Sequence, residues 1–229
     1  MKRVSVIIPA YNEEEAVEKV LLDVYGEFPA LRTIGYSLET ILVLNNCTDR
    51  TEEIARRLKR EKLGALVIAN ESRKGYGYAH RRGIAIAKGD VLVTLDCDDT
   101  YPPGAITNMV QLLDGEYSFV TTDRLRKNPA MGSTSKIGNF LLSTVSKILT
   151  GQSLSDSQSG MWGFRREHIA DLLAGVGGGM ELSEQLKLRL ARAADKWTCI
   201  DIDYYERMGE SKLNPVGDGL RCLWHLVRT

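Results

Sequence analysis

The first hundred residues alternate between short, mostly apolar runs and segments in which apolar residues recur at helical spacing. The runs are rich in Val, Ile and Leu, which is typical of strands buried on both faces of a sheet. Strands are predicted at 4–8, 39–44, 66–69 and 91–95, and amphipathic helices at 16–24, 54–58 and 79–87. Repeated strand–helix units predict an α/β fold with a doubly wound, mostly parallel sheet and helices on both faces.

The pattern after residue 100 is less regular and contains one long uncharged segment. A helix that begins at Pro102 and strands at 117–122 and 198–202 continue the α/β architecture. The segment 133–150 has apolar residues at helical spacing, so it is predicted either to fill the core or to lie against lipid. Residues 218–228 predict a basic amphipathic helix, for which packing on the core and contact with a membrane both stay open.

Polar residues follow each predicted strand of the first half. These segments are 9–13 (PAYNE), 45–49 (NNCTD), 70–77 (NESRKGYG) and 96–99 (DCDD). Because ligands of parallel sheets bind beyond the carboxyl ends of the strands, the four segments are predicted to share one site. Asp96 and Asp98 would point the same way from an extended backbone and could hold a divalent cation that neutralises a diphosphate. The alternative is a polar turn that closes a core strand.

Composition limits the partners and the compartment. Thirty basic residues balance thirty acidic ones among 229, so no general field favours nucleic acid or another polyanion. The four cysteines lie far apart without a CxxC pair and no signal peptide precedes Val4, which favours a reduced, cytoplasmic setting. No apolar run approaches the ~20 residues of a membrane-spanning helix, so a soluble or membrane-peripheral protein is expected. Neither a GxGxxG fingerprint nor a GxxxxGKS/T phosphate loop is present.

Three loops of the second half carry candidate chemistry. Arg124 lies in the basic segment 122–127, and arginine presents a planar fork to phosphate oxygens. Asp156 lies in a Ser/Gly loop before an apolar strand, where it could take a proton in a pocket. Arg207 and Lys212 lie in a glycine-containing loop after the strand 198–202. The alternatives are solvated loops for the cations and a turn aspartate bonded to its own backbone for Asp156.

In order and spacing, the motifs of residues 1–125 resemble the inverting family 2 glycosyltransferases of the Rossmann-like GT-A fold. The matching residues are PAYNE at 9–13, Thr48-Asp49, Lys74-Gly75, Gly89-Asp90 and Asp96-Cys97-Asp98. The resemblance implies a nucleotide-sugar site at Pro9, Tyr11, Glu13, Asn45, Lys74 and Asp96, and a Mg²⁺ or Mn²⁺ site at Asp98 and Asp96. Asn45-Asn46 stands where the family often has an acidic pair, so the choice between a GDP- and a UDP-hexose donor stays open.

The second half resembles the dolichyl-phosphate mannose synthase and polyprenyl-phosphate hexosyltransferase branch of that family. The matching patterns are DxQSGxxxF from Asp156 and RxGESKL from Arg207. The resemblance implies transfer of a hexose, mannose or glucose first, to a polyprenyl phosphate. It assigns Asp156 as catalytic base or acceptor-site acid, and Arg207 and Lys212 as groups that bind phosphate of the donor or the acceptor. Arg124 is a candidate for the same chemistry from its place in the basic segment alone.

The same resemblance suggests how the chain is organised. One domain is expected at 1–215, with a nucleotide-sugar half at about 1–125 and an acceptor half at about 126–215, followed by an amphipathic tail at 216–229. Peripheral contact with the cytoplasmic face of a membrane is expected through 133–150 and 218–228. The alternatives are a glycosyltransferase with a soluble hydroxyl acceptor, which would require Asp156 as a true general base, and a non-catalytic nucleotide-sugar-binding module.

Overall fold

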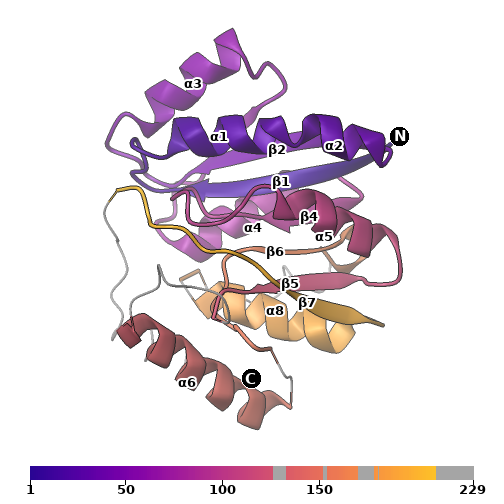
Figure 1. Ribbon diagram of the computed structural model, residues 1–229. Helices are drawn as coiled ribbons and strands as arrows, with labels where there is room; N and C mark the ends of the chain where they lie inside the picture. The colour runs from indigo at the N-terminus through magenta and orange to yellow at the C-terminus, as the bar shows by residue number, and fades with distance from the viewer. Residues whose placement is uncertain (126–132, 152–153, 170–177, 180, 210–229) are drawn as a thin grey trace.

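The computed structural model describes residues 1–125, 133–151, 154–169, 178–179 and 181–209. The described part is built on a seven-stranded sheet with the strand order β3-β2-β1-β4-β6-β5-β7 (Figure 1). The strands are β1 (Lys2–Ala10), β2 (Tyr36–Leu44), β3 (Val67–Asn70), β4 (Val91–Thr94), β5 (Phe119–Asp123), β6 (Trp162–Arg165) and β7 (Trp197–Asp201). The helices are α1 (Val17–Gly26), α2 (Phe28–Thr33), α3 (Thr51–Glu61), α4 (Tyr76–Ile86), α5 (Ala105–Asp114), α6 (Ser133–Thr150) and α8 (Glu181–Ala193), with a short 3₁₀ turn at Arg166–His168.

The sheet is mostly parallel, which confirms the predicted fold class. β1 lies between β2 and β4 and is parallel to both, so that Ile7 is opposite Ile41 on one side and Thr94 on the other. β6 is the exception, because it runs antiparallel between β4 and β5. β7 is parallel to β5, so the carboxyl ends of six of the seven strands face the same edge of the sheet.

Apolar side chains pack on both faces of the sheet. In the first core, side chains on one face of β1 pack against α1, α3 and α5, which contribute residues such as Val20, Leu58 and Met109. The second core joins Ile7 and the neighbouring strands to α4 and α8. Gly83 brings α4 very close to β1, since a Cβ added there would lie 2.3 Å from Cγ2 of Ile7. Figure 1 accordingly shows α1 and α5 in front of the sheet and α4 behind it.

Some predicted boundaries were wrong. β1 was expected to end before Pro9 but continues to Ala10. The Ala10 carbonyl faces β2, where it accepts from the amide of Asn45, so alternation turns the nitrogen of Pro9 towards β4. The pairing of β4 with β1 has ended by then, so no ladder bond is lost. Helix α1 begins at Val17, one residue after its predicted start, and Glu13 lies in the preceding loop.

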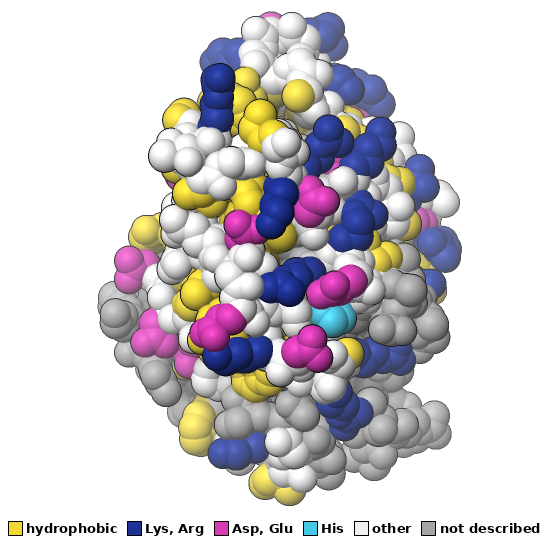
Figure 2. Space-filling view, turned by 90° about the vertical axis from the view of Figure 1, so that its right-hand side faces the viewer, with side chains coloured by type: hydrophobic (Ala, Val, Ile, Leu, Met, Phe, Trp, Pro, Cys, Tyr) yellow, Lys and Arg dark blue, Asp and Glu magenta, His cyan; other side chains and the backbone are white. Residues whose placement is uncertain are grey.

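The predicted helix at 133–150 has the bounds of α6. Lys212 and the predicted tail at 216–229 lie outside the described residues, as does 126–132. In the part of the chain that the structure describes, no helix is long and apolar enough to cross a membrane. Figure 2 faces the end of the molecule where the parallel strands begin, and there basic and acidic side chains are interspersed, in keeping with the balanced charge.

Candidate active site

Three strand ends are joined by one arginine. Arg207, in the segment after β7, donates from one terminal nitrogen to Oδ2 of Asp98 and from the other to Oε1 of Glu13, each over 2.8 Å. Asp98 follows β4 and is buried, and Glu13 follows β1. The segment is fixed by backbone bonds from Tyr205 to Thr100 and from Met208 to Asp98. The structure therefore brings together three residues that were predicted separately from distant parts of the sequence.

The arginine retains an unused donor. Its Nε is buried and has no hydrogen-bond partner among the described residues. Two carboxylates thus share one guanidinium, and the N–H group of its Nε faces no acceptor among the described residues. Such a group favours an additional acceptor atom, and an anionic oxygen is the strongest kind.

Asp96 experiences a local excess of negative charge. Burial and the neighbouring charge of Asp98 raise its pKa to about 6. The phenol of Tyr76 donates to its Oδ1 over 2.7 Å, which stabilises the charged form only in part. Asp99 instead pairs with Lys19 of α1 and adopts a left-handed backbone with φ 62°. The three acids of the motif are therefore placed in three different environments.

The loop between β3 and α4 is held by a buried amide. Asn45 donates from Nδ2 to the carbonyls of Glu71 and Arg73 and accepts at Oδ1 from the amide of Gly75. Gly75 needs to be glycine, because its φ is 147° and a Cβ would lie 2.3 Å from the carbonyl oxygen of Gly178. Asn45 was predicted to contact the nucleotide, but its side-chain amide is hydrogen-bonded to the loop that carries Lys74.

Lys74 and Tyr11 lie together at the same edge. The ammonium of Lys74 sits 5.1 Å from the centroid of the Tyr11 ring, a cation–π contact. Both side chains are at least partly exposed. Pro9, by contrast, is buried within β1 and can contribute only through its backbone or ring edge.

Arg124 and Asp156 form a buried ion pair. Arg124 follows β5 and donates from Nε to Oδ2 of Asp156 over 2.7 Å and from a terminal nitrogen to Oδ1 over 3.0 Å. The rings of Tyr101 and Tyr204 lie 5.8 and 5.2 Å from the guanidinium carbon. Burial alone would raise the pKa of Asp156, but the charge and hydrogen bonds of Arg124 keep that pKa below its ordinary value. Asp156 is therefore a fully buried, paired carboxylate.

The turn that carries Asp156 ends against Asp96. Gly160 donates its amide to the phenol oxygen of Tyr101 over 2.6 Å, and its carbonyl accepts from the hydroxyl of Thr94 over 2.9 Å. A Cβ at Gly160 would lie 2.1 Å from Oδ2 of Asp96, so only glycine leaves room for that carboxylate. The two acidic motifs of the sequence are thus in direct contact through one backbone unit.

The sequence reasoning missed the aromatic and basic residues that frame these acids. Tyr76, Tyr101 and Tyr204 all contact charged site residues. Lys187 is completely buried in α8 and bonds to the carbonyl of Ser159. A lysine on the leucine-rich face of a helix was the one available signal, since burial of a lone cation is rare.

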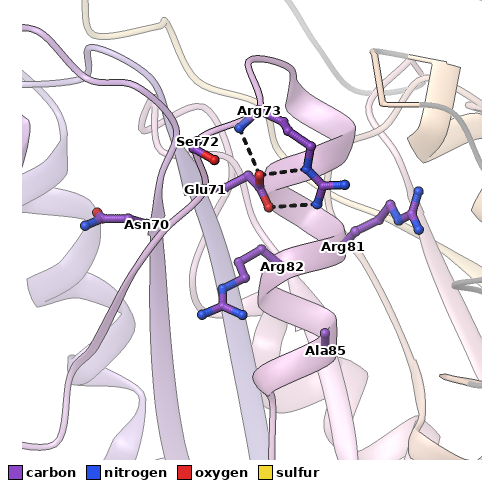
Figure 3. Close-up of a pocket in the computed structure, with 7 residues that line it drawn as sticks. All are labelled: Asn70, Glu71, Ser72, Arg73, Arg81, Arg82 and Ala85. Carbon is purple, nitrogen blue, oxygen red and sulfur yellow. Dashed lines mark hydrogen bonds and ion pairs between the residues drawn. The ribbon is translucent and has the colours of Figure 1, made fainter.

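A separate basic pocket lies outside this constellation. Figure 3 shows it between the loop after β3 and the flank of α4, where Glu71 holds Arg73 through both carboxylate oxygens. It has a volume of about 330 Å³ and is lined by Asn70, Glu71, Ser72, Arg73, Arg81, Arg82 and Ala85. Four of these residues, 70–73, belong to the segment 70–77 that was predicted to join the site, but none of the seven was assigned a role there, and Glu71 pairs with Arg73.

Among the described residues, no three His, Cys, Asp or Glu side chains converge in a cluster that could hold a metal ion by itself. A magnesium ion commonly takes only one or two carboxylates from the protein and the rest of its ligands from water and substrate phosphates. Asp98 and Asp96, the predicted ligands, are two carboxylates of this kind. The donor set therefore fits a cation that binds together with a diphosphate.

Comparison with known proteins identifies relatives of the whole chain. The family model described as Glycosyl transferase family 2 matches residues 5–173. A dolichyl-phosphate hexose transferase of Haloferax volcanii is 33% identical over 216 residues, which cover 94% of this chain and 88% of that protein. An undecaprenyl-phosphate 4-deoxy-4-formamido-L-arabinose transferase of Pectobacterium atrosepticum is 31% identical over 232 residues, which cover 97% of this chain and 68% of that protein.

A solved structure shares the fold. Glucosyl-3-phosphoglycerate synthase from Mycobacterium tuberculosis, in complex with Mn²⁺, UDP and phosphoglyceric acid, aligns with a TM-score of 0.68 at 21% identity. The alignment covers 99% of this chain and 75% of that structure. At this level of identity the likeness shows the fold alone, which is the predicted GT-A fold.

Proposed function

Because the chain belongs to glycosyl transferase family 2, we propose that it transfers a hexose from a nucleotide sugar to a polyprenyl phosphate, with inversion at the anomeric carbon. The observation that supports this most directly is the meeting of Glu13, Asp98 and Arg207 at the carboxyl edge of the sheet. That edge is where ligands of such sheets bind. A relative named for transfer to dolichyl phosphate, aligned over nearly the whole of both chains, supports the lipid acceptor.

In this proposal the acidic motif holds the donor. Asp98 and Asp96 would hold a Mg²⁺ or Mn²⁺ ion, since such an ion commonly takes one or two carboxylates from the protein. Bound metal would supply neutralisation of the charge that develops on the departing diphosphate. Tyr11, Lys74 and the loop fixed by Asn45 hold the base and ribose, either of a GDP- or of a UDP-hexose.

Arg207 is shared between two carboxylates. Its guanidinium pairs with both Asp98 and Glu13 and compensates one of their two charges. We assign Arg207 to phosphate oxygens of the bound donor, since the fork of an arginine fits such oxygens, and we propose Lys212, which lies outside the described residues, for the same task. The buried and unpartnered Nε supports this role.

The acceptor needs little acid–base help. A phosphate oxygen is already anionic at pH 7, so it can attack the sugar carbon C1 while the bond from C1 to the diphosphate breaks, in one in-line displacement. Asp156 is buried and bound to Arg124 through both oxygens, which supports an orienting role for the pair in preference to proton abstraction.

Contact with a membrane would come from α6. This helix buries Ser143 and Ser146 and exposes Phe140, Leu141 and Ile148, by 63, 56 and 75%. An apolar face turned outwards supports peripheral binding at the lipid surface where a polyprenyl phosphate resides, on the cytoplasmic side, with the tail at 216–229 as a second contact. The catalytic domain would then span 1–215.

A transfer assay tests the proposal. The purified chain is incubated with Mn²⁺, with GDP-mannose or UDP-glucose, and with either a polyprenyl phosphate or phosphoglyceric acid, and products are identified by mass spectrometry. We expect a glycosylated lipid phosphate with one donor and no product from the Asp98→Asn variant. Transfer to phosphoglyceric acid alone would refute the lipid acceptor. Nucleotide binding without transfer to either acceptor would favour a binding module.

A further inference from the structure

One lysine buried beneath the site has no role in the mechanism above. Lys187 of α8 has no exposed surface, and Leu186 and Leu190 beside it on the helix are equally buried. Its Nζ donates to the carbonyl oxygen of Ser159 over 2.7 Å. Among the described residues this is its one hydrogen bond.

That bond holds one end of a particular peptide unit. The carbonyl of Ser159 and the amide of Gly160 belong to the same peptide plane. Lys187 binds the carbonyl, and the phenol oxygen of Tyr101 accepts from the amide over 2.6 Å. A cation on the oxygen polarises the peptide and makes its N–H a better donor, so the two bonds reinforce each other. The peptide plane is thereby fixed at both ends.

The fixed peptide is the wall against which Asp96 lies. There is no space for even a methyl group between Gly160 and the carboxylate of Asp96. A small rotation of the Ser159–Gly160 plane would therefore move Asp96 or open a gap beside it. At its other end the same turn carries Asp156, whose backbone carbonyl accepts from the amide of Ser159 over 3.3 Å.

A buried ammonium is an unfavourable choice for packing alone. Burial disfavours its charged form, which lowers the pKa of Lys187 to about 8, and the charge of Arg124 acts in the same direction. The carboxylates of Asp156 and Glu184 offset this effect only in part. An apolar side chain of similar volume would usually be at least as stable at such a position. The presence of a lysine here is thus better explained by its hydrogen bond to the Ser159 carbonyl than by its packing in the core.

We propose that Lys187 is a positioning residue for the donor site, which sets the Ser159–Gly160 peptide against Asp96 and so determines the affinity for the nucleotide. This inference rests on the proposed function. It extends the donor site to α8.

The test compares four proteins by calorimetric titration of UDP and of GDP in the presence of Mn²⁺. They are the wild type, Lys187→Met, Lys187→Arg and Leu190→Ala. The methionine keeps the length of the side chain without its charge, and the arginine keeps the charge. Leu190→Ala removes a buried side chain from the same helix and keeps Lys187, and so controls for loss of stability.

We expect Lys187→Met to weaken binding of the preferred nucleotide about tenfold, as suits a lost hydrogen bond to a charged group. Lys187→Arg should recover part of that loss. The Kd of Leu190→Ala should stay within about twofold of the wild-type value, even if its melting temperature falls as much as that of Lys187→Met. The turnover number of Lys187→Met at saturating donor should change less than its KM. The amide proton resonance of Gly160 should move in Lys187→Met alone.

Two results would overturn the inference while leaving the proposed function intact. One is a Lys187→Met protein that binds the nucleotide within twofold of the wild type. The other is a Leu190→Ala protein that loses as much affinity as Lys187→Met. If Lys187→Met does not fold, Lys187→Gln takes its place under the same criteria. A wild-type protein that binds neither nucleotide would refute the donor site itself, and the role of Lys187 with it.

Discussion

The charged side chains of the site are paired with one another. Arg124 is matched by Asp156, and Arg207 is matched by Asp98 and Glu13. Removing one member of a buried pair leaves the other charge without compensation, which is far more destabilising than breaking an exposed pair. Single substitutions at these residues therefore change stability as well as chemistry, and the two effects have to be measured separately.

Asp156→Asn should lower the free energy of unfolding by about 3 kcal/mol, because Arg124 would be left buried with a neutral partner. Urea denaturation measures this. Asp99→Asn is the matched control, since Asp99 pairs with a half-exposed lysine and its loss should be below about 1 kcal/mol. Equal effects of the two variants would contradict the buried pair. Turnover of Asp156→Asn is informative about proton abstraction only at a temperature where the variant is fully folded.

Arg207→Gln should have opposite effects on metal binding and on transfer. Without the guanidinium, Asp98 and Glu13 keep an uncompensated negative charge, so the affinity for Mn²⁺ in the absence of nucleotide should rise about tenfold. Transfer should fall by about a hundredfold or more because a phosphate contact is lost. Electron paramagnetic resonance of free Mn²⁺ measures the first effect. Arg50→Gln, which breaks an exposed pair with Glu14, should change neither quantity.

His80 should make the protein less stable in mild acid. Burial lowers its pKa to about 4, with the ring packed between Tyr76 and Trp162. The folded state keeps the ring neutral while the unfolded chain takes up a proton below about pH 6.5, so stability is complete above that pH and is lost as the pH falls towards 4. Unfolding free energies at pH 7.5 and 5.5 should differ by about 1 kcal/mol from this group. His80→Phe should abolish that difference, and an unchanged slope would refute the assignment.

At the scale of elements, the sequence predicted the helices and strands that depend on a local pattern. It did not predict features that depend on which segment packs or pairs with which. The run 133–150 has the bounds of α6, and the strand–helix units of the first half are present. β6 runs antiparallel between β4 and β5, which an apolar run cannot reveal because it has the same composition in either direction. Helix α4 begins at Tyr76, three residues before its predicted start, because Gly75 and Gly77 pack against Gly178 and Gly179, far away in the sequence.

In the candidate site, too, some features could be predicted from the sequence and others could not. Asp98, Glu13 and Arg207 became candidates because their loops follow strands, and their roles came from the resemblance to family 2 glycosyltransferases. The bond between Arg207 and Glu13 joins residues 194 positions apart, so no local spacing could predict it. Lys187 and Tyr101 act through a backbone unit of another loop, and a sequence contains no sign of which carbonyl or amide a side chain will meet.

The exposed face of α6 should bind lipid without contributing to folding. Replacing Phe140, Leu141 and Ile148 together with Ser should abolish flotation with vesicles that contain anionic lipid and leave the free energy of unfolding within about 1 kcal/mol, since these side chains are mostly exposed. Tyr25→Ser, an exposed aromatic on α1, is the control and should float like the wild type. Flotation of the triple variant would exclude α6 as the contact, and unfolding of that variant would show that its apolar face packs in the molecule.

At the scale of the molecule, the site joins segments from the two ends of the described chain. Residues from β1, β4 and the segment after β7 meet at Arg207, so the first and the last described strands take part in one cluster. The opposite end of the molecule carries mixed charges without a basic field (Figure 2). Binding energy gained at the strand ends therefore acts on the whole fold, and the global stability of the protein can report it.

Donor and metal should accordingly stabilise the whole chain, and only together. A nucleotide at about 100 times its Kd adds about 2.7 kcal/mol to the free energy of unfolding. For a chain of this size that raises the melting temperature by roughly 5–10 °C. A thermal-shift screen of GDP and UDP with Mn²⁺ should show such a rise with one nucleotide. Because Asp98 and Asp96 need the diphosphate to complete the coordination of the ion, Mn²⁺ alone should give a far smaller rise. Chelation by EDTA, or the Asp98→Asn substitution, should remove most of the nucleotide effect. A full shift in EDTA would mean that the nucleotide is held without metal, with Arg207 as the main neutralising group.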